Sequence, residues 1–364
     1  MLFSSLFARM PAIKDGLGLG EGELGIALLC GSAGLILSQP LAGALTTRFG
    51  SRPLCAAGTL LYGGLTPLLA LMDGYAAFLV VFFALGVGSG VLDVAMNAQG
   101  ALAEARHPHA IFSSFHAAFS FGAMGGAALS GALAALDVDP AANLGGLGLA
   151  AIVVGLAATS GMLPPAADER GDGRLFARPT GPLAVLGAVA FCAAVSEGAV
   201  ADWSAILLNE WRDASEATAA AGLTAFSATM GVCRLAADPL REQLGAQGLM
   251  RLGAITVLIG LAPVLLPLGV APAVAGLALL GAGLASLFPL AILLGSRVPG
   301  ESAAAGIAAV STAGYAGFLA GPATIGFLAE TSSLPVGLAV MAPLALAVVA
   351  LAPRACAVGE VVAR

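Results

Sequence analysis

The sequence predicts an all-α integral membrane protein whose chain forms two pseudo-symmetric halves. Of its 364 residues, 59% are hydrophobic and only 10% are charged, whereas a soluble domain carries about 25% charged residues. Apolar runs of at least about 18 residues recur along the chain, and each is long enough to cross roughly 30 Å of hydrocarbon as a helix. The glycine pattern of the first half also returns in the second half.

The apolar runs predict eleven membrane spans. Five precede a polar stretch at 164–181 and six follow it. The expected spans are 22–46, 53–71, 75–99, 110–136, 144–163, 182–208, 216–238, 249–268, 271–295, 302–328 and 332–353.

An internal repeat explains the unequal number of spans. A shift of 195 residues brings six glycines onto six others, namely Gly50, Gly86, Gly100, Gly122, Gly126 and Gly131 onto Gly245, Gly281, Gly295, Gly317, Gly321 and Gly326. Such duplication is typical of transporters with two six-helix halves. The helix at 182–202 then matches a first helix of which only the last residues are present. We therefore expect a first helix that is largely missing, with a genuine eleven-span protein as the alternative.

The repeat divides the chain into an N-terminal half at 1–163, a linker at 164–181 and a C-terminal half at 182–364. Arginines predict the orientation, because cytoplasmic loops are enriched in basic residues. The loops on one side carry eleven arginines, and the opposite loops carry only Arg9, Lys14 and Arg212. Both termini and the linker are therefore expected to be cytoplasmic, in the inner membrane of a bacterium.

Composition also limits the partners. Lys14 is the only lysine and basic runs are absent, so nucleic-acid binding is not expected. The five cysteines and three histidines show no metal-ligand spacing, and no catalytic motif accompanies the serines. We expect a monomer in the lipid bilayer that is not an enzyme and has no cofactor or metal.

Asp93 is the first candidate functional residue. It lies in GVGSGVLDVAMNAQG, inside the long apolar run that begins at Tyr75. A charge near the middle of a membrane helix costs about 2.5–3.5 kcal/mol on insertion scales, so it normally faces protein or a watery cavity. Helical spacing places Gly86, Gly90, Asp93 and Asn97 on one face. We predict that Asp93 loads and releases a proton, with Asn97 and Gln99 contacting a solute. A structural acid paired with an arginine or with a helix end is the alternative for Asp93.

The next helix carries a polar stripe formed by Ser113, His116 and Ser120. Phe112, Phe115 and Phe119 are displaced from this stripe. The pattern predicts a helix that lines a wet cavity on its polar side and packs on its aromatic side. A histidine there is suited to titration or to hydrogen bonding with a polar solute, and a satisfied core histidine is the alternative.

The second half contributes Glu197, Trp203, Arg234 and Asp238. Glu197 is predicted to lie inside its membrane helix, where an acid indicates function by default. It is expected to contact solute or to serve as a second proton site. Trp203 is expected at the outer boundary, as a solute contact or an interfacial anchor. Arg234 and Asp238 are spaced one turn apart and predict a local ion pair that gates the cytoplasmic side.

Two groups of motifs resemble known membrane transporters. The loop GALTTRFGSR, with Arg48 and Arg52, resembles the G-x-L-x-D-R-x-G-R-R motif of the major facilitator superfamily, although Thr47 occupies the acidic position. The stretches GSGVLDVAMNAQG, SSFHAAFSFGAMGGA and SEGAVADWSAILL resemble YbjJ-type transporters of that superfamily. GVLDVAMNAQG is also similar to a pattern of the fucose–proton symporter family. These resemblances imply a gating role for Arg48 and Arg52 and a proton-coupling role for Asp93.

The predicted function is secondary transport of a small polar solute, sugar-like or another metabolite, by alternating access with proton coupling. Proton-driven efflux of a metabolite or drug is one alternative. A membrane sensor or scaffold that transports nothing is an alternative from another class. Neutralising Asp93 and Glu197 would be tolerated by a scaffold and would impair a transporter.

Overall fold

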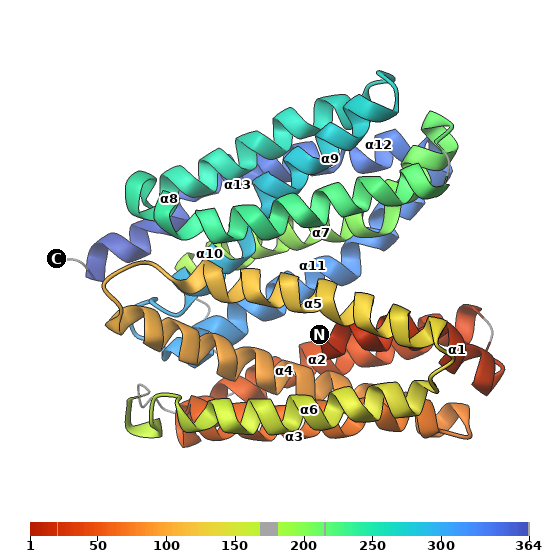
Figure 1. The fold of residues 1–364 in the computed structure, drawn as a ribbon. Coiled ribbons are helices and arrows are strands. Elements are labelled where there is room, and N and C mark those ends of the chain that lie inside the picture. The colour runs from red at the N-terminus through yellow and green to blue at the C-terminus, as the bar shows by residue number, and fades with distance from the viewer. Residues whose placement is uncertain (20, 168–180, 215, 363–364) are drawn as a thin grey trace. The chain divides into compact units, whose positions relative to one another are not determined.

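A computed structural model describes the chain except for residues 20, 168–180, 215 and 363–364. Within these residues the regular structure is entirely helical (Figure 1). The first part contains α1 (Leu2–Leu17), α2 (Glu21–Phe49), α3 (Ser51–Leu68), α4 (Tyr75–Arg106), α5 (Phe112–Ala135) and α6 (Pro140–Ser160). The second contains α7 (Gly181–Arg212), α8 (Glu216–Leu265), α9 (Val270–Leu284), α10 (Leu287–Gly295), α11 (Ala303–Thr331), α12 (Leu334–Leu338) and α13 (Met341–Val362). Short 3₁₀ turns occupy Leu69–Leu71 and Pro165–Ala167.

Among the described residues, ten helical segments are long and apolar enough to cross a membrane. One of them, Gly222–Leu265, has 44 residues and reverses direction at Gly245, whose φ of 69° suits glycine. The sequence divided this segment into the spans 216–238 and 249–268. The structure therefore confirms the all-α membrane class and accounts for each predicted span. Helix α1 has 16 residues, fewer than the about 20 needed for a full crossing.

Contacts group the chain into two units. Unit 1 contains residues 1–105, 118–177 and 302–308, and unit 2 contains residues 106–117, 178–301 and 309–364. The first residues of α5 thus belong to unit 2, and the first residues of α11 belong to unit 1. The predicted boundaries at 163 and 182 remain predictions, and most of the predicted linker lies outside the described residues.

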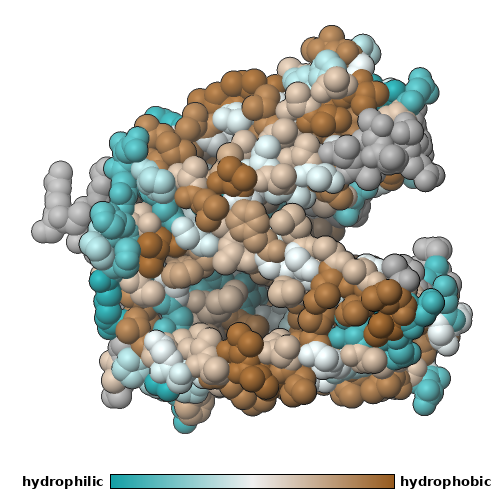
Figure 2. Space-filling view, viewed as in Figure 1, coloured by the Kyte–Doolittle hydropathy of each residue, from teal (hydrophilic) through white to brown (hydrophobic). Residues whose placement is uncertain are grey.

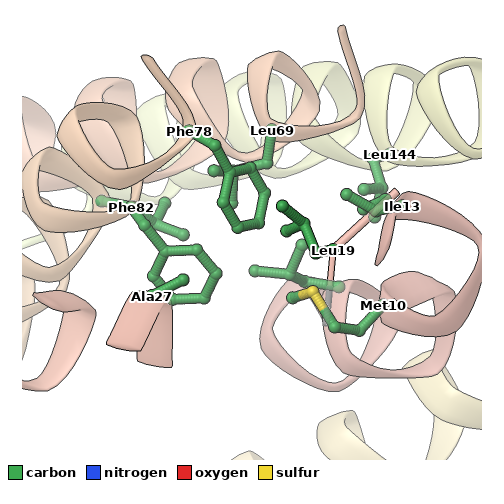
Figure 3. Close-up of a cluster of buried hydrophobic side chains, with 10 residues drawn as sticks. Met10, Ile13, Leu19, Ala27, Leu69, Phe78, Phe82 and Leu144 are labelled. Atoms are coloured by element: carbon green, nitrogen blue, oxygen red, sulfur yellow. The ribbon is translucent and has the colours of Figure 1, made fainter. Parts of the chain in front are cut away.

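The core of unit 1 is a cluster of apolar side chains from α1, α2, α4, α6 and the Leu69–Leu71 turn. Figure 3 shows the rings of Phe78 and Phe82 beside Met10 and Leu19. The two ring centroids are 5.5 Å apart in an edge-on arrangement, which is a favourable geometry for aromatic pairs. This packing holds the first turns of α4 against α2.

Glycines set the closest helix crossings, and these crossings repeat in the two parts of the chain. Gly86 of α4 touches the backbone carbonyl of Gly31 in α2, and Gly281 of α9 touches the carbonyl of Phe226 in α8. Both members of the second pair lie 195 residues after those of the first. A side chain at either glycine would collide with backbone. The structure therefore reproduces the internal repeat as the same helix contact made twice.

Apolar side chains also cover outward surfaces of each unit, as Figure 2 shows for the visible face. Leu37, Val80 and Val154 are each about two-thirds exposed, at 68%, 68% and 67%. Phe327 in unit 2 is equally exposed, at 67%. Hydrocarbon is the solvent in which such surfaces are stable, and exposed apolar area of this kind marks membrane contact.

Candidate functional site

Asp93 of α4 lies between two side-chain amides. Gln39 of α2 donates from Nε2 to Asp93 Oδ2 at 3.3 Å, and Asn97 donates from Nδ2 to Asp93 Oδ1 at 3.1 Å. Gln39 and Asn97 are buried, while Asp93 is half-buried. The carboxylate therefore receives one donor from its own helix and one from a neighbouring helix. Two neutral donors can orient a carboxyl group whether or not it carries a proton.

Glycines make the contact between Gln39 and Asp93 geometrically possible. A Cβ at Gly90 would lie 2.7 Å from the carbonyl oxygen of Leu35, so α2 and α4 also approach closely there, one turn after Gly86. Gln39 precedes Pro40, which α2 accommodates within its length. The sequence placed Asp93 and Asn97 on one face but did not identify Gln39 as a partner. A glutamine beside a proline in an apolar helix was the available signal.

Gln99 makes a different set of contacts. Its Nε2 donates to Ser51 Oγ and to the carbonyl of Leu163, both at 2.9 Å. Its Oε1 accepts from the backbone N–H of Leu163 at 3.2 Å. These three bonds join α4 to the start of α3 and to the residues after α6. These bonds give the buried amide of Gln99 a structural role, because buried polar groups need hydrogen-bond partners.

Glu197 of α7 forms an ion pair with Arg234 of α8. The distance between Arg234 Nη2 and Glu197 Oε2 is 3.6 Å, and the two side chains are 9% and 25% exposed, respectively. Arg234 Nε also donates to the carbonyl of Ala285 at 3.3 Å. Ala285 and Ser286 interrupt the span that α9 and α10 form together. Interrupted membrane helices are recurrent features of transporter binding sites.

His116 lies close enough to Arg234 to experience its charge. The imidazole packs against Phe112, with ring centroids 5.3 Å apart. Phe115 and Phe119 are 44% and 54% exposed. The aromatic side of α5 was expected to pack, and of its three phenylalanines only Phe112 is buried.

Asp238 holds the beginning of α5. Its carboxylate accepts from the backbone N–H of Ser113 at 3.0 Å and from the N–H and Oγ of Ser114 at 2.8 and 2.9 Å. Arg241 lies 3.7 Å from it. The predicted local pair of Asp238 with Arg234 stays a prediction, and the structure gives ion pairs of Arg234 with Glu197 and of Asp238 with Arg241. A carboxylate at a helix N-terminus satisfies orphan N–H groups and complements the helix dipole.

A related contact joins α2 to the start of α11. Thr47 Oγ1 lies 2.7 Å from Ser302 Oγ, and Ser302 Oγ accepts from the backbone N–H of Ala305 at 3.2 Å. A Cβ at Gly43 would lie 2.9 Å from Ala308 Cβ. Gly43 and Ala308 are each 195 residues before or after Asp238 and Ser113. The repeat therefore makes equivalent contacts, one through a charge and one through small neutral residues.

The remaining predicted residues are not gathered at one point. Arg48 stacks over the ring of Phe49, 5.3 Å from its centroid, and Arg52 is half-buried. Ser120 is half-buried in unit 1. Trp203 is half-buried with the edge of its ring against Gly326 in α11. Its indole N–H is buried and has no hydrogen-bond partner among the described residues.

Apolar spans and acids held between helices define a polytopic helical-bundle protein of the transporter class. A family model described as Major Facilitator Superfamily matches residues 1–194. An uncharacterized MFS-type transporter of Yersinia pestis is 34% identical over 342 residues, which cover 94% of this chain and 88% of the relative. This chain belongs to the major facilitator superfamily.

Other comparisons agree with this assignment. Membrane protein MosC of Rhizobium meliloti is 28% identical over 338 residues, covering 92% of this chain and 82% of the relative. The crystal structure of the superfamily transporter FucP in its outward conformation has a TM-score of 0.77 at 16% identity, covering 97% of both chains. The human organic anion transporter MFSD10 has a TM-score of 0.74 at 18% identity, covering 96% and 95%. These structures establish the fold alone.

Proposed function

We propose that this protein moves a small polar solute, sugar-like or another metabolite, across the bacterial inner membrane by alternating access coupled to protons. The observation that carries the proposal is the placement of Asp93 between amides of Gln39 and Asn97. A membrane-embedded acid that is half-buried and oriented by neutral donors is suited to exchange a proton with a water-filled cavity. A related structure is described as a fucose:proton symporter, which supports the same class of chemistry.

Solute contacts would come from a small number of polar side chains. Asn97 offers a polar group beside Asp93, and His116 offers one near Arg234. Trp203 offers a buried N–H with no partner among the described residues. A few polar groups in an otherwise apolar cavity are the usual means of orienting a small molecule. Ser113 and Ser120 flank His116 along α5 and are further candidates. Gln99 is the weakest member of the predicted set, because its amide is already satisfied.

The proposed cytoplasmic gate consists of the contacts at the beginnings of α5 and α11. On the α5 side, Asp238 binds the amides of Ser113 and Ser114. On the α11 side, Thr47 contacts Ser302. Arg48 and Arg52 follow Thr47 and complete the motif by position. Since both contacts join helices from opposite halves of the repeat, both must break when the cytoplasmic side opens.

Transport in proteoliposomes tests the proposal. Purified protein would be reconstituted with a pH-sensitive dye inside, and a panel of sugars, polyols and small metabolites would be added outside. The expected result is a solute-dependent pH change with wild type that is lost in Asp93→Asn. Asp73→Asn, at an exposed acid before α4, is the matched control and is expected to behave as wild type.

The two variants also distinguish the alternatives. Unchanged coupling in Asp93→Asn would show that Asp93 is structural and would contradict the mechanism. Solute-driven proton movement in the opposite direction would identify efflux instead of import. Solute transport by wild type without any proton movement would support the transport function and contradict the proton coupling.

A further inference from the structure

The two acids of the proposed site are held by side chains at equivalent positions of the repeat. Gln39 and Arg234 are 195 residues apart. Gln39 extends from α2 to Asp93 on α4, and Arg234 extends from α8 to Glu197 on α7 and to the carbonyl of Ala285. One half thus presents an uncharged amide to its acid, and the other presents a permanent cation.

An amide and a guanidinium favour different charge states of a carboxyl group. The amide of Gln39 offers both a donor and an acceptor, so it can bond either the ionised or the protonated form of Asp93. Arginine remains protonated under all physiological conditions and carries donors only. Protonation of Glu197 would remove its ion pair with Arg234, and a guanidinium 3.6 Å away favours the charged form of a carboxyl group. The geometry therefore favours an ionised Glu197.

We infer that Glu197 stays ionised throughout the transport cycle and binds solute hydroxyl groups, while Arg234 is the positioning residue that holds its carboxylate. This inference rests on the proposed function and assigns Glu197 one of its two predicted roles. The exposures agree with it, since Glu197 is 25% exposed and Arg234 only 9%. The acid is therefore the member of the pair that an entering solute meets.

Other charged groups around the pair are compatible with this assignment. His116 from α5 is a titratable group within electrostatic range of Arg234. Asp238 lies one turn along α8 from Arg234 and is engaged by Arg241 and by the start of α5. Glu197 forms an ion pair with Arg234 directly, at 3.6 Å.

Infrared difference spectroscopy tests the charge states without a solute. Lipid-reconstituted protein would be titrated from about pH 9 to about pH 5, and the carbonyl stretch of protonated carboxyl groups would be recorded. Glu197→Gln is expected to give the same spectrum as wild type. Glu330→Gln, a control at an exposed acid in α11, is also expected to give the wild-type spectrum. Arg234→Gln is expected to gain a titrating carboxyl signal, and the double variant Arg234→Gln/Glu197→Gln is expected to lose it.

The double variant also separates charge from folding. Removing one partner of a buried ion pair is destabilising, whereas removing both can be nearly neutral. The double variant Arg234→Gln/Glu197→Gln is therefore expected to fold even if Arg234→Gln alone unfolds. If Arg234→Gln unfolds, the comparison of wild type with Glu197→Gln shows whether Glu197 titrates. A titrating signal that disappears in Glu197→Gln would overturn the inference.

Transport distinguishes this inference from the proposed function. For a panel solute that moves protons, Glu197→Gln is expected to raise KM while each transported solute still moves its proton. Loss of proton movement with retained solute transport in Glu197→Gln would overturn the inference and leave proton-coupled transport intact. Absence of coupling in wild type, together with the expected infrared spectra, would contradict the proposed function and leave the charge assignment standing.

Discussion

At the scale of single residues, the surroundings of a side chain matter more than its type. Asp93 and Glu197 are both acids in apolar helices, and the sequence alone gave them the same candidate role. Their contacts differ, because Asp93 accepts from Gln39 and Asn97, whereas Glu197 faces Arg234. In the proposed mechanism, the partner from another helix is what distinguishes the acid that exchanges a proton from the acid that stays charged.

Trp203 yields a prediction at the same scale. Its indole N–H is buried and has no hydrogen-bond partner among the described residues, so a solute can accept from it without displacing another bond. Trp203→Phe keeps the aromatic ring and removes the donor. Loss of one hydrogen bond is expected to weaken solute affinity by about 0.5–1.5 kcal/mol, or roughly 2- to 13-fold.

Binding measured by the thermal shift of the purified protein checks this prediction. Trp211→Phe is the matched control, because Trp211 is 45% exposed at the end of α7. It is expected to leave affinity unchanged. Equal affinity in Trp203→Phe and wild type would assign Trp203 to the membrane interface, the alternative role that its position suggests.

At the scale of helices, glycines determine which side chains meet. Gly86 and Gly90 place α4 directly against the backbone of α2. Gln39 reaches Asp93 only because this crossing is so close. The same type of crossing at Gly281 brings α9 against α8, and the interruption at Ala285 that receives Arg234 follows one turn later.

Gly86→Ala is expected to destabilise the protein and to separate Gln39 from Asp93. The added methyl group would collide with the carbonyl of Gly31, and such overpacking typically costs about 1–3 kcal/mol. Gly64→Ala in α3 is the control, since a Cβ there meets nothing within 4 Å. It is expected to stabilise its helix by up to about 1 kcal/mol. Unfolding in denaturant checks both, and equal stabilities would contradict the role of the crossing.

At the scale of the whole molecule, the repeat produces two equivalent helix-end contacts with unequal chemistry. The start of α5 is held by the carboxylate of Asp238, and the start of α11 meets Thr47 and Gly43. The superfamily motif places its acid at the position of Thr47. In this chain the charge is found in the other half, where the corresponding helix end retains an acidic partner.

Asp238→Asn is therefore expected to favour opening of the cytoplasmic side. Asparagine retains one acceptor oxygen but loses the charge that the amides of Ser113 and Ser114 and the guanidinium of Arg241 share. Charge-assisted bonds contribute about 1.5–3 kcal/mol, which is enough to shift a two-state population about tenfold or more. Spin labels at Arg106 and Arg297, in a background without native cysteines, would report the shift as longer distances.

A matched acid in the same region separates this effect from a general loss of charge. Glu242 accepts from the backbone N–H of Ala110 at 2.7 Å, two residues before α5 begins. The Glu242 side chain is exposed, so solvent can replace that hydrogen bond. Glu242→Gln is expected to give a smaller change in the distance distribution than Asp238→Asn. Equal changes would show that the start of α5 is held by summed charge and not by Asp238.

Much of the fold was predictable from composition and the repeat, whereas the site was predictable only in part. The spans followed from apolar run length, and the face shared by Asp93 and Asn97 followed from helical spacing. Gln39 was missed as a partner of Asp93 because residues so distant in sequence meet only through helix packing. The burial of Phe112 and the exposure of Phe115 and Phe119 could not be predicted either, since a helical wheel does not state which neighbours each side chain meets.

The sequence by itself determined the membrane class, the two repeated halves and the residues that bear charge inside the membrane. These properties depend on hydrophobicity and periodicity, which are local and additive along the chain. Only the tertiary structure decided that Gln39 binds Asp93, that Arg234 pairs with Glu197 and that Asp238 holds the start of α5. The physical reason is that each of these contacts joins two helices, and close crossings between helices depend on the packing of both.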